Sequence, residues 1–429
     1  MVKGISHKIR ETMKDELGEL GVNIFENQCK SMGVLPDDLS PENLDELSDK
    51  MFESVRYFTG IDKAEIIKKG IRKYKLLDKL KDLREEEETN YQLTKEYDIL
   101  MELGETGIDL GQMDESCRYF EKAQSISDRL GDDEKKAESI LGCSYARCEN
   151  GELDKAEDEA DEAIGLCEKS GYGSGTAQGY MRKGIVYWRH GEFDKAMEEI
   201  TKAEKISREV EDNEDLAVIL KNKADIYGEK EEYSKALEYY NKSKGLYEEM
   251  DSHYHMTVVT MNMGVIYSLK KEWDKAAEYY ERSQKMSKEY DYPNKRAWAL
   301  FNLGESYIYM DEYEKAEEAL SQSVELLEEQ HDPLGEAGAK MKFGQLYLEI
   351  GEYEKAEPFF DDTIETLREI NIPRYLADAL HEMGKVKKEL GYLEQAEEYM
   401  EEAYQIYDSL GIDVRKESVK EDIDELVNL

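Results

Sequence analysis

One pattern returns every 40 residues over most of this chain, and it limits the folds available to the chain. A first position of the pattern is small in all eight copies: Gly104, Ser144, Gly184, Ala224, Gly264, Gly304, Gly344 and Gly384. A second position is also small: Ser116, Ala156, Ala196, Ala236, Ala276, Ala316, Ala356 and Ala396. A position between them is always apolar: Met113, Leu153, Phe193, Tyr233, Trp273, Tyr313, Tyr353 and Leu393. Because the copies stay in register without an insertion, the chain is predicted to form a solenoid of repeated units.

The segment Ala297–Ala316 shows the nature of one unit. Its buried face is expected to contain residues at the i, i+3, i+4 and i+7 spacing of a helix, namely Leu300, Leu303, Gly304 and Tyr307. A polar turn at Asp311 and Glu312 follows, and a second amphipathic helix begins near Tyr313. Each unit is therefore predicted to be a helical hairpin, and the fold class to be all-α.

The flanking segments do not follow the repeat. Residues 1–84 are predicted to form a small helical domain of about four helices, residues 91–410 the eight repeats, and residues 411–429 a capping helix. Ser40 followed by Pro41 predicts the start of a helix, because serine caps helix N-termini and proline suits the first turn. That helix is expected to stop near Gly60.

Charge is distributed unevenly along the chain. The net charge is −42, yet residues 1–84 contain 16 basic and 16 acidic residues, so the whole excess lies in residues 85–429. The acidic run Glu85–Glu88 marks the junction with the repeats. Residues 62–84 are locally basic, which favours either a helix that docks on an acidic partner, such as the acidic array itself, or the solvated face of a small bundle.

The strongly negative net charge of the whole chain argues against nucleic acid as a partner. Two explanations of this negative charge stay open: a cytoplasm rich in salt, or ordinary solvated helix faces.

The cysteines and the hydropathy bear on location. The five cysteines are odd in number and contain no CxxC motif, so a reducing cytoplasm is expected rather than a disulfide framework. No apolar run approaches the roughly 18 residues of a membrane span. The first residues lack the apolar core of a signal peptide. A cytoplasmic protein without a membrane partner is expected.

The sequence holds no pattern typical of catalysis. No Gly-rich phosphate loop, HExxH motif or nucleophile elbow is present. Cys143 and Cys148 are five residues apart, so they do not stack on one helical face, and His253 with His255 would need a third ligand to hold a metal. We therefore expect neither an enzyme nor a cofactor or metal.

The pattern resembles the tetratricopeptide repeat (TPR). The resemblance is carried by NLGESYIYMDEYEKAEEAL at 302–320, MGVIYSLKKEWDKAAEYY at 263–280 and FGQLYLEIGEYEKAEPFF at 343–360, and it covers roughly three quarters of the chain. The usual repeat has 34 residues. The 40-residue version is similar to the long-repeat branch, which includes kinesin light chains, spindle-orientation adaptors and Rap-type regulators. The resemblance implies a right-handed α-solenoid without chemistry of its own.

In that family the first helix of each repeat lines a concave groove that binds peptides. Residue by residue, this implies a peptide-binding groove at Met181, Trp188, Arg189, Lys221, Asn222, Met261, Asn262, Phe301, Asn302, Glu305, Tyr309, Met341 and Gln345. Peptide-binding members of the branch use a ladder of asparagines, and three of these residues occupy one repeat position: Asn222, Asn262 and Asn302. An asparagine both donates to and accepts from an extended backbone. It is also a tolerated polar residue beside a buried apolar one. The carboxylate clamp of chaperone-binding members is not matched, because Asp225 stands where asparagine is needed after Lys221.

These patterns favour a scaffold that binds a segment or helix of another protein. The alternative is a regulator in which a ligand moves the N-terminal helices on or off the array. A DNA-binding N-terminus is a distant third reading, because residues 41–59 are acidic and no recognition helix is evident. Self-association is left open by the sequence.

Overall fold

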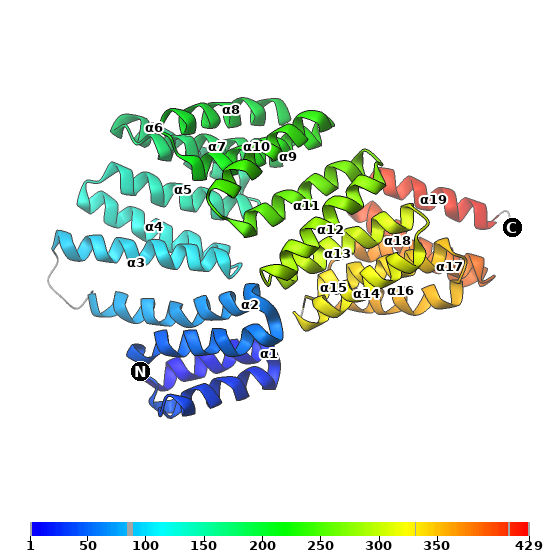
Figure 1. Cartoon of the computed structure of the whole chain (residues 1–429), viewed down its shortest axis with the longest axis horizontal. Helices are drawn as coiled ribbons and strands as arrows, with labels where there is room; N and C mark the ends of the chain where they lie inside the picture. The colour runs from blue at the N-terminus through cyan, green and yellow to red at the C-terminus, as the bar shows by residue number, and fades with distance from the viewer. Residues whose placement is uncertain (1, 84–88, 331, 411, 428–429) are drawn as a thin grey trace. The chain divides into compact units, whose positions relative to one another are not determined.

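The repeats fold as pairs of helices with the same period as the sequence pattern. A computed structural model describes residues 2–83, 89–330, 332–410 and 412–427, and within these residues the chain forms 19 α-helices, two short 3-10 turns and no strand. The predicted junction at Glu85–Glu88 and the first residue of the predicted cap, Gly411, lie outside the described residues. The all-α solenoid predicted from the sequence is confirmed (Figure 1).

Each repeat contributes a first and a second helix. The first helices are α3 (Asn90–Asp109), α5 (Asp133–Glu149), α7 (Gly173–Arg189), α9 (Asn213–Glu229), α11 (His253–Leu269), α13 (Pro293–Tyr309), α15 (Pro333–Glu349) and α17 (Pro373–Glu389). The second helices are α4 (Met113–Leu130), α6 (Leu153–Ser170), α8 (Phe193–Glu209), α10 (Tyr233–Glu249), α12 (Trp273–Glu289), α14 (Tyr313–Glu329), α16 (Tyr353–Glu369) and α18 (Leu393–Leu410). A last helix, α19 (Asp413–Val427), packs on α18.

The helices end where the sequence signals indicate. Gly131 and Gly171 have positive φ angles of 69° and 79° and terminate α4 and α6, because glycine adopts the left-handed conformation without a Cβ penalty. Pro293, Pro333 and Pro373 each stand in the first turn of a helix, where the missing N–H leaves no hydrogen bond unmade. The turns therefore fix the period of the solenoid.

Small residues bring the two helices of a hairpin together. A Cβ atom added at Gly304 would lie 2.6 Å from Leu320 Cγ, and one added at Gly344 would lie 2.6 Å from Phe360 Cε2. Ala316 is fully buried. The buried hydroxyl of Ser323 donates to the Ala297 carbonyl at 2.9 Å, which ties α14 to α13. The small columns of the sequence are thus the positions of closest helix approach.

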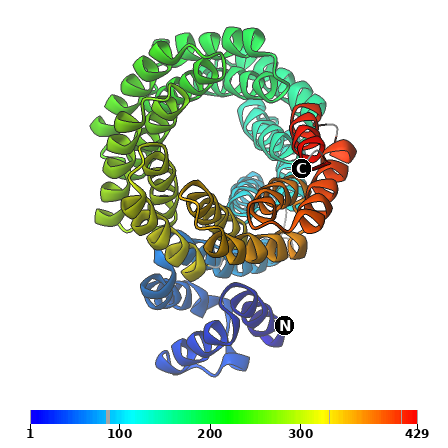
Figure 2. The same cartoon turned by 90° about the vertical axis from the view of Figure 1, so that its right-hand side faces the viewer.

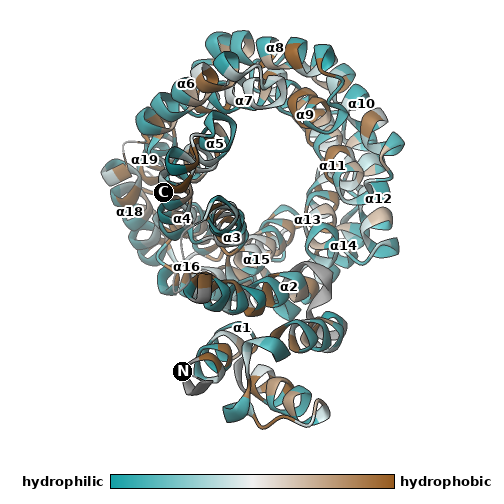
Figure 3. Cartoon of the chain, turned by 90° about the vertical axis from the view of Figure 1, so that its left-hand side faces the viewer, coloured by the Kyte–Doolittle hydropathy of each residue, from teal (hydrophilic) through white to brown (hydrophobic). Residues whose placement is uncertain are grey.

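The contacts divide the chain into two compact units, Met1–Val259 and Thr260–Leu429. In the first unit α5, α7 and α9 lie on the concave side, and α6, α8 and α10 cover the convex side (Figures 2 and 3). In the second unit α13 and α15 lie on the concave side and α14 and α16 on the convex side (Figure 3). The first helix of each pair therefore presents one face to the inside of its own unit.

Two helices precede the repeats. The first, α1 (Val2–Ser31), is interrupted at Gly18, which has φ 58° and ψ −149°. The second, α2 (Leu44–Leu83), pairs Lys75 with Asp45, although a straight helix would hold these residues about 45 Å apart. Residues between them must therefore reverse the chain direction, and the predicted stop at Gly60 falls in this stretch.

The start predicted at Ser40–Pro41 is also present. Pro41 opens a 3-10 turn, Pro41–Asn43, that leads directly into α2. The Ser40 N–H donates to Asn43 Oδ1 at 3.1 Å, which caps this turn. A similar turn, Pro36–Asp38, lies upstream.

The end of α2 is joined to the first repeat. Leu76 and Leu80 share a hydrophobic core with Leu93, Leu100 and Leu103 of α3. Lys69 pairs with Asp109 at 2.5 Å, and the buried Lys73 donates to Gln112 at 2.6 Å and to Glu115 at 2.8 Å. The basic residues of α2 thus contact acidic residues of the array.

Candidate functional site

The second unit contains an apolar cavity. It has a volume of about 230 Å³, and its lining comes mainly from α13 and α15, with one residue each from α16 and α17: Trp298, Phe301, Leu334, Ala337, Gly338, Met341, Leu367 and Tyr375. We call it the apolar cavity. Two predicted groove residues, Phe301 and Met341, therefore share one site.

The local packing explains why this space stays open. The rings of Trp298 and Phe301 meet edge to face, with centroids 5.6 Å apart. Gly338 carries no side chain, and a Cβ added there would meet only Phe301, at 3.9 Å. Leu334 and Tyr375 are 38% and 44% exposed at the rim. The recess is therefore apolar and accessible from its rim.

A larger, polar cavity lies further along the same helices. Its volume is about 650 Å³, and three predicted groove residues line it: Glu305, Tyr309 and Gln345. Its charges are largely matched within the protein, because Lys342 pairs with Glu305, and Lys385 pairs with Glu382 at 3.0 Å. Tyr309 is 58% exposed but stacks on Trp273 with centroids 4.1 Å apart.

The three asparagines do not share one environment. Asn262 and Asn302 are half-buried on α11 and α13, as is Met261 beside Asn262. Asn222 is only 6% exposed and accepts a hydrogen bond from Lys221 Nζ at 3.3 Å. Lys221 in turn pairs with Asp225 at 2.9 Å. The three amides are therefore not equally accessible in this structure.

Other predicted groove residues of the first unit serve packing and pairing. Met181 is 4% exposed and belongs to the core of its repeat, and Trp188 packs against that core. Arg189 donates to Glu149 Oε1 at 2.5 Å and to the Cys148 carbonyl at 3.3 Å. Met181 shares its repeat position with Phe301 and Met341 but is buried in the core of its own repeat, and its role in a groove stays a prediction.

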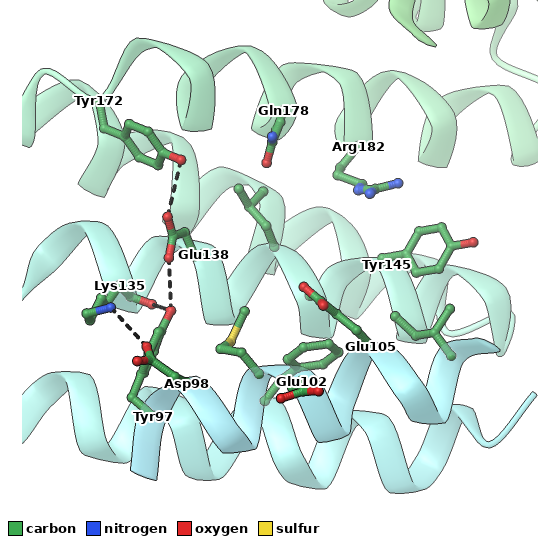
Figure 4. A pocket seen from close by; sticks show the side chains of 15 residues that line it. Tyr97, Asp98, Glu102, Glu105, Lys135, Glu138, Tyr145, Tyr172, Gln178 and Arg182 are labelled. Carbon is green, nitrogen blue, oxygen red and sulfur yellow. Dashed lines mark hydrogen bonds and ion pairs between the residues drawn. The ribbon is translucent and has the colours of Figure 1, made fainter. Parts of the chain in front are cut away.

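A charged cavity on the concave face of the first unit was missed by the sequence analysis (Figure 4). It has a volume of about 540 Å³ between α3, α5 and α7. Its polar lining residues are Tyr97, Asp98, Glu102, Glu105, Lys135, Glu138, Tyr145, Tyr172, Gln178 and Arg182. We call it the charged cavity.

One side of the charged cavity is held by a hydrogen-bond network. Tyr97 Oη lies 2.7 Å from the Lys135 carbonyl and 3.1 Å from Glu138 Oε2, and the Tyr172 hydroxyl donates to Glu138 Oε1 at 3.2 Å. Burial, followed by the charge of Glu138, raises the pKa of Tyr172 to about 12. Tyr172 therefore stays a neutral donor and fixes the Glu138 carboxylate.

The other side holds charged groups without such partners. Arg182 extends from α7 and places its guanidinium over the Tyr145 ring, 4.4 Å from the centroid (Figure 4). Among the described residues no carboxylate lies within 4.0 Å of it, and desolvation lowers its pKa. Desolvation and then the charges of Asp109 and Glu102 raise the pKa of Glu105.

Arg182 also has a sequence signature. It stands one 40-residue period before Asn222, so it occupies the repeat position of the three asparagines. Glu102 and Lys342 occupy the same position in their own repeats. The signal that would have revealed the charged cavity was the change of residue type along this column.

The described residues contain neither a cluster of metal ligands nor a helix that could span a membrane. These residues contain no group of three or more His, Cys, Asp or Glu side chains placed to hold a metal ion. His255 is used locally: its ring stacks on Tyr247, and Nδ1 lies 2.8 Å from the Ser252 hydroxyl. All five cysteines are free and buried. Within the part of the chain that is described, no helix combines the length and apolarity needed to cross a bilayer.

Comparison with solved structures shows the fold in several other proteins. A signal transduction ATPase with a tetratricopeptide repeat sensor from Pyrococcus horikoshii is 14% identical, with a TM-score of 0.59 over 98% of this chain and 74% of that one. A Rap protein in complex with competence and sporulation factor is 15% identical, with a TM-score of 0.53 over 90% and 100%. The apo quorum sensor NprR from B. thuringiensis is 15% identical, with a TM-score of 0.51 over 78% and 97%.

Comparison with families gives a direct assignment. No curated protein matches the chain. A model of the tetratricopeptide repeat matches residues 175–249, 256–329 and 336–409, and a second model of that repeat matches residues 97–129. These matches cover more than half of the chain and agree in register with the helical hairpins. The chain belongs to the tetratricopeptide repeat family.

Proposed function

We propose that this protein is a non-catalytic binding scaffold whose concave face holds an extended segment of a partner protein. The observation that carries the proposal is the apolar cavity, where α13 and α15, with one residue each of α16 and α17, leave an open recess between aromatic and aliphatic side chains. Its volume of about 230 Å³ is below the roughly 300–1,000 Å³ of pockets for drug-sized ligands. It suits a single large apolar side chain of a peptide.

The polar groups beside the cavity suit the backbone of such a peptide. Asn302 follows Phe301 on α13 and is half-buried, so part of its side chain is accessible. An amide both donates to and accepts from peptide groups. An apolar anchor would supply affinity, and backbone hydrogen bonds would hold the segment extended. Asn262 offers the same chemistry on α11.

The experiment fills the cavity without disturbing the helix that forms it. Gly338→Leu places a side chain into the recess, and replacing a mid-helix glycine favours the helix. Heptapeptides are first selected from a displayed random library on the full wild-type chain. Their affinity is then measured by fluorescence anisotropy on wild type and on the variant.

We expect the selected peptides to share a large apolar residue and to bind Gly338→Leu about tenfold or more weakly. Gly245→Leu is the matched control, because Gly245 lies on α10 of the convex layer with open space around its Cβ position. Equal affinity for wild type and Gly338→Leu would contradict the proposal.

A second candidate function is a ligand-gated regulator, and the docking of α2 favours it. Lys69 and Lys73 pair with acidic residues of the first repeat, while Leu76 and Leu80 enter its core. The NprR and Pyrococcus neighbours carry the words quorum sensor and sensor in their names, which fits this role by analogy. Because apolar contacts reinforce the ion pairs, salt alone is not expected to release α2.

Hydrogen exchange distinguishes the regulator from the simple scaffold. If a selected peptide moves α2, amides of residues 64–83 lose protection when the peptide is added. Protection that is unchanged in this segment, with the peptide bound, would exclude the regulator and leave the scaffold.

A further inference from the structure

One repeat lacks an aromatic contact that other repeats make. In three repeats a tyrosine of the first helix stacks on an aromatic ring twelve residues later, in the second helix: Tyr227 on Tyr239, Tyr267 on Tyr279 and Tyr347 on Phe359. The ring centroids are 5.4, 5.2 and 5.6 Å apart. The sixth repeat keeps the tyrosine as Tyr307 but has Ala319 at the position of the second ring.

Ala319 is the exception in its column. Every other copy has a large side chain at this position: Tyr119, Glu159, Glu199, Tyr239, Tyr279, Phe359 and Tyr399. Lys315 lies over the Tyr307 ring at 5.2 Å, as Lys275 lies over Tyr267 at 5.3 Å. Among the described residues, however, no aromatic ring stacks on Tyr307. Tyr307 therefore has only one of the two ring contacts that Tyr267 has.

The missing ring leaves a cavity of about 480 Å³ between α12, α13 and α14. We call it the gap cavity. Its apolar lining consists of Ala319 with three buried residues of α13, namely Leu300, Leu303 and Tyr307. Gln284 of α12 also lines it, and the Gln284 Oε1 atom is buried without a hydrogen-bond partner among the described residues. Such an acceptor favours an occupant that brings a donor.

Two charged residues of the lining also lack partners. Lys285 of α12 and Glu318 of α14 are exposed, and within the described part of the chain neither has a hydrogen bond or an ion pair. A peptide segment covers the apolar lining with an aromatic ring, while its flanking residues supply a donor and opposite charges. A free aromatic compound would cover the apolar lining and leave both charges unpaired. The lining therefore favours a protein segment.

We propose that the gap cavity is a second docking site, which receives an aromatic side chain of a partner protein. The ring stacks on Tyr307, in the place that Tyr279 and Phe359 fill in the neighbouring repeats. The cavity lies between two second helices, α12 and α14, and it shares no residue with the apolar cavity. The proposal therefore does not rest on the function proposed above.

The first test restores the missing contact within the chain. Ala319→Tyr introduces the residue that Tyr239 and Tyr279 provide in their own repeats. Because the space is open, the melting temperature of the full chain should rise by about 2 °C. Ser321→Tyr is the matched control, since Ser321 is exposed on the same helix and does not line the cavity. Its melting temperature should equal that of wild type.

The second test looks for the partner chemistry. Heptapeptides from a displayed random library are selected on the full wild-type chain and depleted on Ala319→Tyr. We expect the retained peptides to share a tyrosine, phenylalanine or tryptophan. Replacing that residue with leucine should weaken binding about tenfold in fluorescence anisotropy. Ser321→Tyr should bind the same peptides as tightly as wild type.

A further probe separates a protein segment from a free compound. The compound p-cresol carries the tyrosine ring alone, so it tests the ring without the flanking groups. In competition with a selected peptide, its dissociation constant should be at least about tenfold higher than that of the peptide. Equal affinities would identify a free aromatic compound as the occupant and overturn the proposal.

Two other outcomes would also overturn it: a melting temperature of Ala319→Tyr below that of wild type, or retained peptides without a shared aromatic residue. The first would show that no ring fits beside Tyr307. Gly338→Leu, which fills the apolar cavity, should leave the affinity of these peptides unchanged. Failure of this proposal is therefore distinguishable from failure of the proposed function.

Discussion

The apolar and charged cavities occupy corresponding positions of the repeat but have opposite chemistry. Trp298 and Gly338 line the apolar cavity at a repeat position that holds Asp98, Glu138 and Gln178 around the charged cavity. The helices that carry these residues have nearly the same length and the same period. The difference teaches that the lining of a cavity in this solenoid is set by side chains, on helices that keep the same period.

The repeat position just before this one shows why the two cavities can differ in their side chains. Ala137, Ala177, Ala297 and Ala337 are at most 1% exposed where the helices pack, so a larger side chain at these four positions would meet the neighbouring helix. The next residue of each helix faces the concave side and carries no packing constraint of this kind. Chemistry can therefore differ from repeat to repeat.

The largest predicted effect concerns two glycines of α15. Gly344→Leu would force a side chain into Phe360, whose ring lies 2.6 Å from where a Cβ of residue 344 would stand, and should lower the free energy of unfolding by about 3 kcal/mol. Gly338→Ala, six residues away at the apolar cavity, should raise it by about 0.5–1 kcal/mol. Urea unfolding followed by circular dichroism measures both. If both variants lose stability equally, Gly338 does not face an open cavity.

The next prediction concerns a variant in which a residue of the apolar cavity is replaced by its counterpart in the charged cavity. Trp298→Gln installs at the apolar cavity the residue that Gln178 provides at the charged one. Peptides selected on wild type should bind about tenfold more weakly, or about 1.4 kcal/mol, because the aromatic wall is lost. Fluorescence anisotropy measures the affinity. Trp273→Gln removes a tryptophan outside the apolar cavity and should leave the affinity unchanged; a loss in both variants would point to a general effect.

A smaller effect is expected from the network that shapes the charged cavity. Tyr97→Phe removes the hydroxyl that contacts the Lys135 carbonyl and Glu138. The first unit should lose about 1 kcal/mol of stability, because the half-buried Glu138 carboxylate gives up one donor. Thermal melting measures the change, with Tyr91→Phe, which alters a 68% exposed tyrosine of α3, as control. An unchanged melting curve for Tyr97→Phe would show that water replaces the hydroxyl.

The smallest effect is a pH dependence at Glu105. Since its pKa in the folded chain is raised, the associated stabilisation is present below the ordinary pKa and is lost as pH rises through the folded value. At pH 7 the charged carboxylate is therefore unfavourable. Glu105→Gln should raise the free energy of unfolding at pH 7 by less than about 0.5 kcal/mol. The gain should disappear near pH 4 in urea titrations. A gain that grows at low pH would contradict the shift.

Much of the fold was readable from the sequence because packing repeats. Gly304 and Ala316 predicted the closest approach of two helices, and the structure places Leu320 against Gly304. Gly131 and Pro293 predicted helix ends that the structure has. These residues determine helix contacts and helix ends through local geometry. Because each repeat has the same geometry, the same residue types return at the same positions.

The candidate sites were only partly readable, because they depend on departures from the pattern. Phe301 and Met341 were predicted to face a groove and do line one cavity. Arg182 was not predicted, because the prediction used the asparagine that recurs at this repeat position and not the arginine that replaces it in one copy. Asn222 is buried next to the ion pair of Lys221 with Asp225, and neither its burial nor the pairing is fixed by spacing alone.

The packing of each helix mainly against its nearest neighbours has a consequence for cooperativity. In such a chain, protection against local opening is a sum of short-range terms, so one segment can open while distant ones stay closed. A ligand in either cavity should therefore slow amide exchange in its own few helices and leave remote helices untouched. Each cavity would then report its occupancy separately, and the chain would behave as an array of local sensors.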